Sequence, residues 1–141
     1  MIDVKNFSTG MKTILVDAAY CFTVENNGKF EVFQDMYNLL ETYENKKIIL
    51  TNADDINIVK YALNKVPYEV FTLKHNPEKT DPEYFNIFLK KHNLNKDEVV
   101  YFEHNIDAVK SAQSFGIDAY YYDSEKKDLE SLKKYLNGSL K

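Results

Sequence analysis

Two patterns of hydrophobic residues alternate along this chain, one typical of buried strands and one typical of helices. Short apolar runs at residues 13–16, 48–50 and 99–102 each end in polar residues, which is typical of strands buried on both faces of a sheet. Between and after these runs, apolar residues recur every three or four positions, as on one face of a helix. The predicted helices cover residues 33–43, 56–66, 80–89, 106–115 and 129–136, and weaker strand patterns lie at 69–72 and 119–122. The chain therefore alternates strand and helix about five times.

This alternation predicts an α/β fold, a three-layer Rossmann-like parallel sheet with helices on both faces. Parallel neighbours need right-handed helical crossovers, which cover both faces of the sheet. Ligands of such sheets bind beyond the carboxyl ends of the strands. Three of the predicted strands end in suitable polar residues, namely Asp17, then Thr51-Asn52, then Glu103-His104. Lys79 lies in a loop before a helix and can reach the same edge, so we expect a site there.

A hairpin signal interrupts the alternation after the first strand. Residues 22–33 alternate around Asn26-Asn27-Gly28, and Asn-Gly favours a tight turn because both residues tolerate a positive φ. A small flap should therefore stand beside Asp17. Residues 1–10 have no periodicity and are expected to form a loose lead-in.

Three predicted helices carry boundary signals. Asp54 or Asp55 can cap the helix over 56–66, and Gly116 can close the helix over 106–115. Residues 80–83, with the sequence TDPE, combine the spacing of a capping box with a proline near the helix start. The helix after Lys79 is therefore expected to begin there.

Composition narrows the class of protein. With 141 residues and 44% hydrophobic content, the chain is long enough to bury a sizeable core, and we expect a single domain over 1–141. No apolar run approaches the ~20 residues that span a bilayer, and the N-terminus does not resemble a secretory signal. We therefore expect a soluble, cytoplasmic protein with no membrane partner. The single cysteine, Cys21, agrees with a reducing compartment and is expected to be a small buried filler.

The charge pattern argues against a nucleic-acid partner. The net charge is −4, and all 18 basic residues are lysines. Without arginine, the chain lacks the side chain best suited to bidentate phosphate and guanine contacts. His75 and His92 are expected on the solvent side, and His104 is the histidine expected near the site.

Taken in order, these motifs resemble those of the haloacid dehalogenase (HAD) superfamily, most of whose members are phosphohydrolases. The resemblance covers about residues 12–123. It rests on the apolar strand ending in Asp17, on "LTN" at 50–52, on "EKTDPEYF" with Lys79, and on "VVYFEHNIDAVKSAQSFGI" at 99–117.

The resemblance implies a role for each of these positions. Asp17 would be the nucleophile that forms an aspartyl-phosphate. Thr51 would donate its hydroxyl, and Asn52 its backbone amide, to phosphoryl oxygens, while Lys79 would neutralise the transferring group. Mg²⁺ would bind between Asp17, the carbonyl of residue 19 and acids of the fourth motif.

Two departures from the family pattern weaken this expectation. Ala19 stands where the phosphatases have a second aspartate, a general acid and base worth ~10²–10⁴ in rate. In the fourth motif the acidic pair is replaced by Glu103-His104, and the later acid falls at Ala108, beside Asp107. An imidazole suits Zn²⁺ or Mn²⁺ better than Mg²⁺. We therefore expect a weakly held metal at Asp17, Ala19, Glu103 and His104, or none.

Other family members without the second aspartate have a large cap domain. Phosphonoacetaldehyde hydrolases have alanine at that position, and haloacid dehalogenases have tyrosine. Here there is room for the flap at 22–33 and for one helix-strand unit between Thr51 and Lys79. The resemblance therefore implies a HAD-like protein with no large cap.

A response-regulator receiver domain is the main structural rival, because it also combines aspartate, threonine and lysine on a parallel sheet. It places an acidic pair after the first strand and its lysine after the fifth. Here a single acid, Asp17, follows the first strand, and Lys79 precedes the fourth. The order of the motifs disfavours this rival.

Three functions stay open on the sequence alone. The first is a degenerate phosphohydrolase that keeps a phosphate pocket of Asp17, Thr51, Asn52 and Lys79. The second is an active phosphomonoesterase that has recruited Glu103, His104 or Asp107. The third is a binding or scaffold protein in which Asp17 and Lys79 survive as a buried ion pair. A phosphorylated small molecule or a phosphoprotein would be the partner, and the oligomeric state is undetermined.

Overall fold

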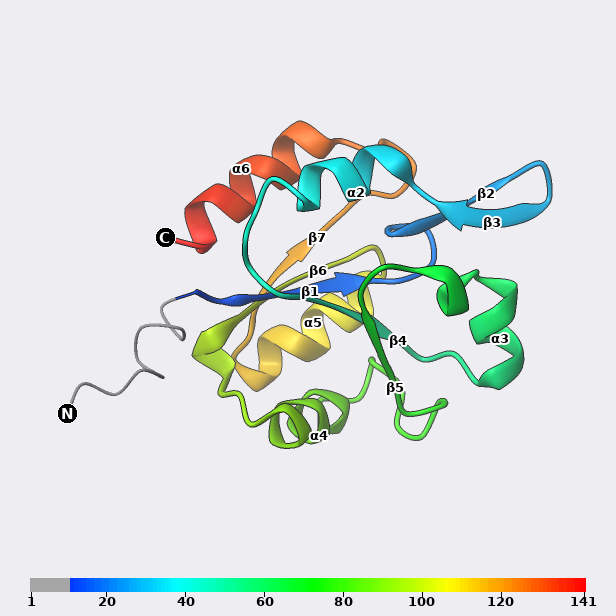
Figure 1. The fold of residues 1–141 in the computed structure, drawn as a ribbon. Coiled ribbons are helices and arrows are strands. Elements are labelled where there is room, and N and C mark those ends of the chain that lie inside the picture. The colour runs from blue at the N-terminus through cyan, green and yellow to red at the C-terminus, as the bar shows by residue number, and fades with distance from the viewer. Residues whose placement is uncertain (1–10) are drawn as a thin grey trace.

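A five-stranded parallel sheet forms the centre of the molecule, with the strand order β5-β4-β1-β6-β7 (Figure 1). A computed structural model describes residues 11–141, and the expected lead-in at 1–10 lies outside the described residues. The strands are β1 (Thr13–Asp17), β4 (Lys47–Thr51), β5 (Glu69–Thr72), β6 (Val99–Glu103) and β7 (Asp118–Tyr121). The predicted Rossmann-like parallel sheet is confirmed.

Helices cover both faces of this sheet, because side chains alternate along each strand. Ile14 and Val16 of β1 pack against α2 (Gln34–Leu40) and α6 (Leu129–Ser139). Leu15 lies between them in the strand and points to the opposite face of the sheet, where it packs in a second hydrophobic cluster with residues of α4 (Glu83–His92) and α5 (Ile106–Phe115). In Figure 1, α2 and α6 lie above the sheet, and α4 and α5 lie below it.

The predicted hairpin is present as an antiparallel pair, β2 (Thr23–Asn26) and β3 (Lys29–Val32). Asn27 (φ 53°) and Gly28 (φ 82°) form its turn with the positive φ values that the Asn-Gly signal predicts. The hairpin projects from the carboxyl end of β1, on the same side of the molecule as α3 (Asp55–Lys60) (Figure 1). Phe30 of β3 contacts Tyr61, just after α3, with ring centroids 4.9 Å apart. The flap is therefore packed against the α3 region.

The helix predicted over 56–66 is wrong in its length and in its buried face. Helix α3 ends at Lys60, because Ala62 adopts a left-handed conformation (φ 59°) that starts the short 3₁₀ turn η1 (Leu63–Lys65). The apolar positions Ile56 and Val59 are 79% and 63% exposed. The helix instead packs against the core through the half-buried Ile58, which is not part of the predicted stripe. A helical period alone therefore did not identify a buried face.

Two of the three predicted helix boundaries are confirmed. Asp54 caps α3 by accepting a hydrogen bond from the Asn57 N–H (2.9 Å), and Gly116 (φ 100°) ends α5. The capping box predicted at 80–83 is not formed. Instead α4 begins at Glu83, whose N–H is held by the Asp81 carboxylate (2.9 Å). Within residues 11–141 no helix combines the length and the apolar character needed to cross a membrane.

Candidate functional site

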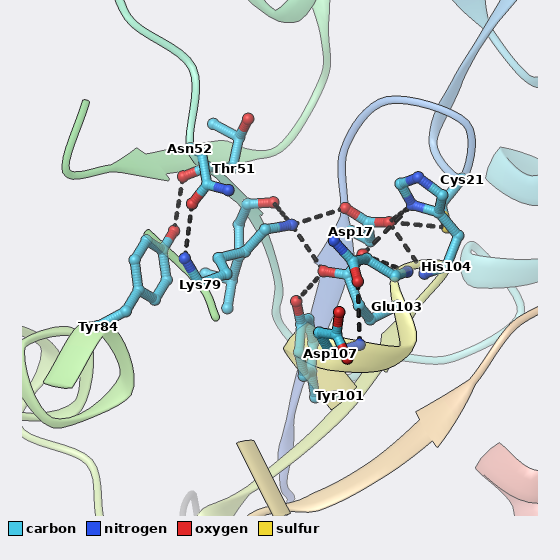
Figure 2. Close-up of polar contacts among 12 residues, drawn as sticks. Asp17, Cys21, Thr51, Asn52, Lys79, Tyr84, Tyr101, Glu103, His104 and Asp107 are labelled. Carbon is cyan, nitrogen blue, oxygen red and sulfur yellow. Dashed lines mark hydrogen bonds and ion pairs between the residues drawn. The ribbon is translucent and has the colours of Figure 1, made fainter. Parts of the chain in front are cut away.

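Asp17 occupies the last position of the central strand, at the middle of the sheet's carboxyl edge. Its strand lies between β4 and β6, so the residues that end those strands lie on either side of it. Its side chain is only 3% exposed. A carboxylate buried this deeply needs hydrogen-bond donors or positive charge nearby. Figure 2 shows that Lys79 and His104 are directed at it from two sides.

The Lys79 ammonium group supplies the first of these charges. Its Nζ lies 2.7 Å from Asp17 Oδ1, 2.7 Å from Glu103 Oε1 and 3.3 Å from the Leu50 carbonyl oxygen. These acceptors match the three donors that an ammonium group has. The lysine side chain is 7% exposed, so the predicted buried ion pair with Asp17 is present and is extended to a second carboxylate.

His104 holds the other oxygen of Asp17. Its backbone N–H donates to Asp17 Oδ2 (3.1 Å), and its ring Nδ1 makes a second, short contact with the same oxygen. The thiol of Cys21 also donates to Asp17 Oδ2 (3.2 Å). Both oxygens of the candidate nucleophile are therefore engaged by groups of the chain itself (Figure 2).

Glu103 is a fully buried partner in this network. Its Oε1 accepts from the Tyr101 hydroxyl as well as from Lys79, and its Oε2 accepts from the Asn105 N–H (3.0 Å). The same Oε2 lies 3.2 Å from Nδ1 of His104. Glu103 thus acts as a counter-charge for the two basic groups around Asp17.

The arrangement fixes the charge state of the site. Burial alone raises the pKa of Asp17, but the Lys79 ammonium and the hydrogen bond from His104 outweigh it and hold the pKa well below the usual range of an aspartate. For His104, burial lowers the pKa, but hydrogen bonds to Asp17 and Glu103 raise it to about 10. At neutral pH the imidazolium and the ammonium therefore neutralise the two carboxylates.

Thr51 and Asn52 lie on the β4 side of the same edge. The Thr51 hydroxyl accepts from the Ala53 N–H (3.1 Å), which leaves its own proton available to a ligand. The Asn52 side-chain oxygen accepts from the Lys79 N–H (2.7 Å) and so fixes the loop that carries Lys79. The Tyr84 hydroxyl donates to the Thr51 carbonyl (2.8 Å) and anchors this end of β4 on α4.

A cavity of about 220 Å³ opens over these residues. Its lining includes six of the seven predicted positions, namely Asp17, Ala19, Thr51, Asn52, Lys79 and His104, whereas Glu103 is fully buried and does not line it. Tyr20 from the loop before the flap and Tyr61 from the α3 region form part of its wall. His75 also lines the cavity, and it is exposed, as predicted. Asp107 does not line it and is exposed in the first turn of α5.

The residues at the predicted metal position do not fit Mg²⁺. This hard cation requires oxygen ligands, usually carboxylates and water. The carboxylates of Asp17 and Glu103 already accept hydrogen bonds from Lys79, and the imidazole of His104 stands where another acid would be needed. Ala19 can offer only its carbonyl oxygen. We therefore assign no catalytic step to magnesium at this site.

Sequence reasoning missed three contributors to the network. Tyr101 precedes Glu103 by two residues on β6, and the strand period of two places both side chains on one face, so this signal was available. Tyr84 begins the apolar stripe of α4 but carries a buried hydroxyl that serves Thr51. Cys21 has no sequence signal, because an irregular loop turns its sulfur back to Asp17.

Comparisons with known proteins support the fold and do not identify a close relative. No family model matches the chain, and no curated protein is significantly similar in sequence. Among solved structures, an uncharacterized protein from Listeria monocytogenes serotype 4b has a TM-score of 0.71 at 14% identity, with 92% of this chain and 98% of that chain covered. An uncharacterized protein from Corynebacterium glutamicum has a TM-score of 0.62 at 17% identity, with 90% and 96% covered.

Two further neighbours carry functional descriptions, and one of these is the core domain of a putative phosphoglycolate phosphatase from Streptococcus pneumoniae (TM-score 0.57, 15% identity, 90% of this chain and 96% of that chain covered). The other is a HAD family enzyme from Bacteroides thetaiotaomicron, an aspartate-to-alanine mutant in complex with magnesium and inorganic phosphate. Its TM-score is 0.63 at 13% identity, with 79% of this chain and 94% of that chain covered. At these identities the likeness is one of fold. Together with the parallel sheet and the flap, it defines a HAD-like fold for this chain.

Proposed function

We propose that this protein is a relative of the HAD phosphohydrolases that retains a phosphate-binding pocket and has impaired or lost phosphomonoester hydrolysis. One observation carries the proposal: both carboxylate oxygens of Asp17 are held by basic groups of the chain, Lys79 on one side and His104 on the other. An attacking carboxylate needs a free oxygen, and this one would first have to give up a buried, charge-assisted hydrogen bond.

The position of Ala19 supports loss of turnover. It lines the cavity beside Asp17, and its methyl group can neither protonate a leaving group nor activate water. Removal of a general acid and base costs ~10²–10⁴ in rate. In addition, the donors of Lys79 are engaged by Asp17, Glu103 and Leu50, so its ammonium has no spare proton for a transferring phosphoryl group.

The other side of the cavity supports retention of an anion site. Thr51 keeps a hydroxyl proton for a ligand, and the loop that carries Lys79 is held in place by Asn52. Lys79 and the protonated His104 also border the cavity, but Asp17 and Glu103 balance their charges, so the Thr51 hydroxyl is the donor that remains for an anion. A phosphorylated small molecule or a phosphoprotein segment is the class of ligand that this pocket would take, and we expect it to act in the cytoplasm.

Hydrolysis of a generic aryl phosphate tests the catalytic part of the proposal. The native chain, Asp17→Asn, and the double variant Ala19→Asp with His104→Asp are assayed with magnesium, manganese or zinc. We expect no turnover by the native chain and magnesium-dependent turnover by the double variant, lost again when Asp17→Asn is added. Native turnover that disappears in Asp17→Asn would instead identify an active phosphomonoesterase.

Titration of inorganic phosphate tests the binding part. We expect calorimetry to detect binding to the native chain and weaker binding to Thr51→Val, which is nearly isosteric but lacks the hydroxyl. If neither the native chain nor the double variant binds phosphate, the pocket is structural, and the chain is a binding or scaffold protein.

A further inference from the structure

Three potential metal ligands of different chemistry lie close together in the site, on Asp17, Cys21 and His104. One atom from each, a carboxylate oxygen, the thiol sulfur and a ring nitrogen, lies within 4.8 Å of the others. Cys21 Sγ is 3.2 Å from Asp17 Oδ2, and Nδ1 of His104 contacts the same oxygen. We propose that these residues form a zinc site at the floor of the cavity.

The donor set is the first argument for zinc. A thiolate, an imidazole and a carboxylate are the ligands found in zinc sites, whereas calcium and magnesium require oxygen. Tetrahedral bonds of ~2.0–2.3 Å place neighbouring ligand atoms about 3.3–3.6 Å apart. The separation of Cys21 Sγ from Asp17 Oδ2, 3.2 Å, is close to this value. Nδ1 of His104 lies closer to Oδ2 than two ligands of one zinc ion can, so the imidazole would have to move outward by about 1 Å on ligation.

The geometry also supplies the features that surround a bound metal. Asp17 keeps Oδ1 on Lys79 (2.7 Å) while Oδ2 faces Cys21 and His104, so the carboxylate is already oriented by a hydrogen bond to its other oxygen. The side chain of His104 is 31% exposed, and both Asp17 and His104 line the cavity. An ion can therefore reach Asp17 and His104 from the cavity, whereas Cys21 is fully buried and does not line it.

Charge balance is the third argument. Zinc would replace the ring proton of His104 on Nδ1 and the thiol proton of Cys21, and both protons would be released to solvent. The zinc ion brings two positive charges, and the two released protons carry two away. The net charge of the site is therefore unchanged, and the ion pair of Lys79 and Glu103 is not disturbed. This exchange explains how a site with too few free carboxylates for magnesium can bind a softer divalent ion.

The inference does not depend on the proposed function, because it requires neither phosphate binding nor hydrolysis. It assigns Cys21 a role that a buried filler would not have. The full chain, stripped of metal with a chelator and kept reduced, can therefore be tested in phosphate-free buffer. Cobalt serves as the first probe because it reports its ligands spectroscopically, and zinc follows as the competitor.

We expect one cobalt ion per chain, with a sulfur-to-cobalt charge-transfer band that zinc abolishes. Since Cys21 is the single cysteine of the sequence, such a band assigns the ligand without any mutation. Cys21→Ser should remove the band, and both Cys21→Ser and His104→Gln should weaken zinc binding roughly tenfold or more. His92→Gln is the matched control, because His92 pairs with Glu69 away from the cavity, and it should bind zinc like the native chain.

Absence of the charge-transfer band in the folded native chain would overturn the proposal. Zinc binding that persists at native affinity in Cys21→Ser would also overturn it and would point to surface histidines. Zinc binding without phosphate binding would leave this site standing while the proposed function fails, so the two outcomes are distinguishable.

Discussion

The two halves of the candidate site differ in how far they follow the HAD pattern. The phosphate half consists of Thr51, Asn52 and Lys79, and it keeps both the residue types and the positions that the resemblance implies. The metal half consists of Ala19, Glu103 and His104, and a methyl group and a protonated imidazole stand there in place of acids. Asp17 belongs to both halves. On the proposed function, holding a phosphate and transferring it are separable tasks, since one half would change while the other persists.

The largest expected effect comes from Lys79, whose ammonium group contacts both Asp17 and Glu103. Lys79→Met leaves two buried carboxylates, Asp17 and Glu103, without their ammonium partner. We expect the free energy of unfolding at neutral pH to fall by about 3–5 kcal/mol. Urea denaturation measures it. Lys74→Met, in the same loop but in an ion pair that is 59% and 85% exposed, is the control and should cost at most about 1 kcal/mol.

A smaller, pH-dependent effect is expected in the metal half. His104→Gln removes a charged hydrogen bond to Asp17 and should cost about 2 kcal/mol near pH 6.5. The pKa of His104 is raised to about 10 in the folded chain, so its stabilisation is complete below the unfolded value of 6.5 and is lost as the pH rises toward 10.

The difference in unfolding free energy between native chain and variant should therefore shrink steadily from pH 6.5 to 9 in the presence of a chelator. A difference that stays constant over this range would mean that the ring is neutral in the folded protein. The contribution of Asp17 to the unfolding free energy changes at acidic pH instead. Because its pKa is lowered, its contribution is lost as the pH falls through the acidic range.

In the phosphate half, we expect a modest loss from Asn52→Ala. This change removes the acceptor of the Lys79 N–H and should cost about 1 kcal/mol. Hydrogen exchange of the Lys79 amide is the more specific measurement, and it should become faster while exchange in β6 is unchanged. If the two regions respond alike, Asn52 stabilises the whole fold and does not specifically hold the loop.

The smallest effect is expected outside the site. Ile56→Ser replaces an apolar residue that is 79% exposed on α3, and it should change the unfolding free energy by less than about 0.5 kcal/mol. Leu63→Ser, at a buried position of the same predicted stripe, provides the contrast and should cost several times more. Equal losses of unfolding free energy in the two variants would mean that Ile56 is buried, as the helical period predicted.

The sequence predicted the central elements because their signals are local and strong. The apolar runs ending in Asp17 and Thr51, the Asn27-Gly28 turn and the Gly116 cap all correspond to observed elements. Each depends on a period or on a backbone conformation that few residues adopt. Their convergence at one edge followed from the rule for parallel sheets.

The connections inside the site could not be predicted in the same way. Lys79 was expected to face Asp17, but its second partner, Glu103, depends on how β6 and the loop after β5 meet in space. Cys21 reaches Asp17 through an irregular loop, for which no period exists. The prediction for helix α3 was wrong for a related reason, because a helical period does not reveal whether a strand face lies beneath the helix.

The closed charge network also limits which acids this site can accept. In the present chain Lys79 and His104 balance Asp17 and Glu103. His104→Asp alone would set three carboxylates against one ammonium, and Ala19→Asp alone would add an unbalanced acid beside Asp17. Both changes together would set four carboxylates against Lys79, so such a site would depend on a bound divalent cation to restore its balance of charge.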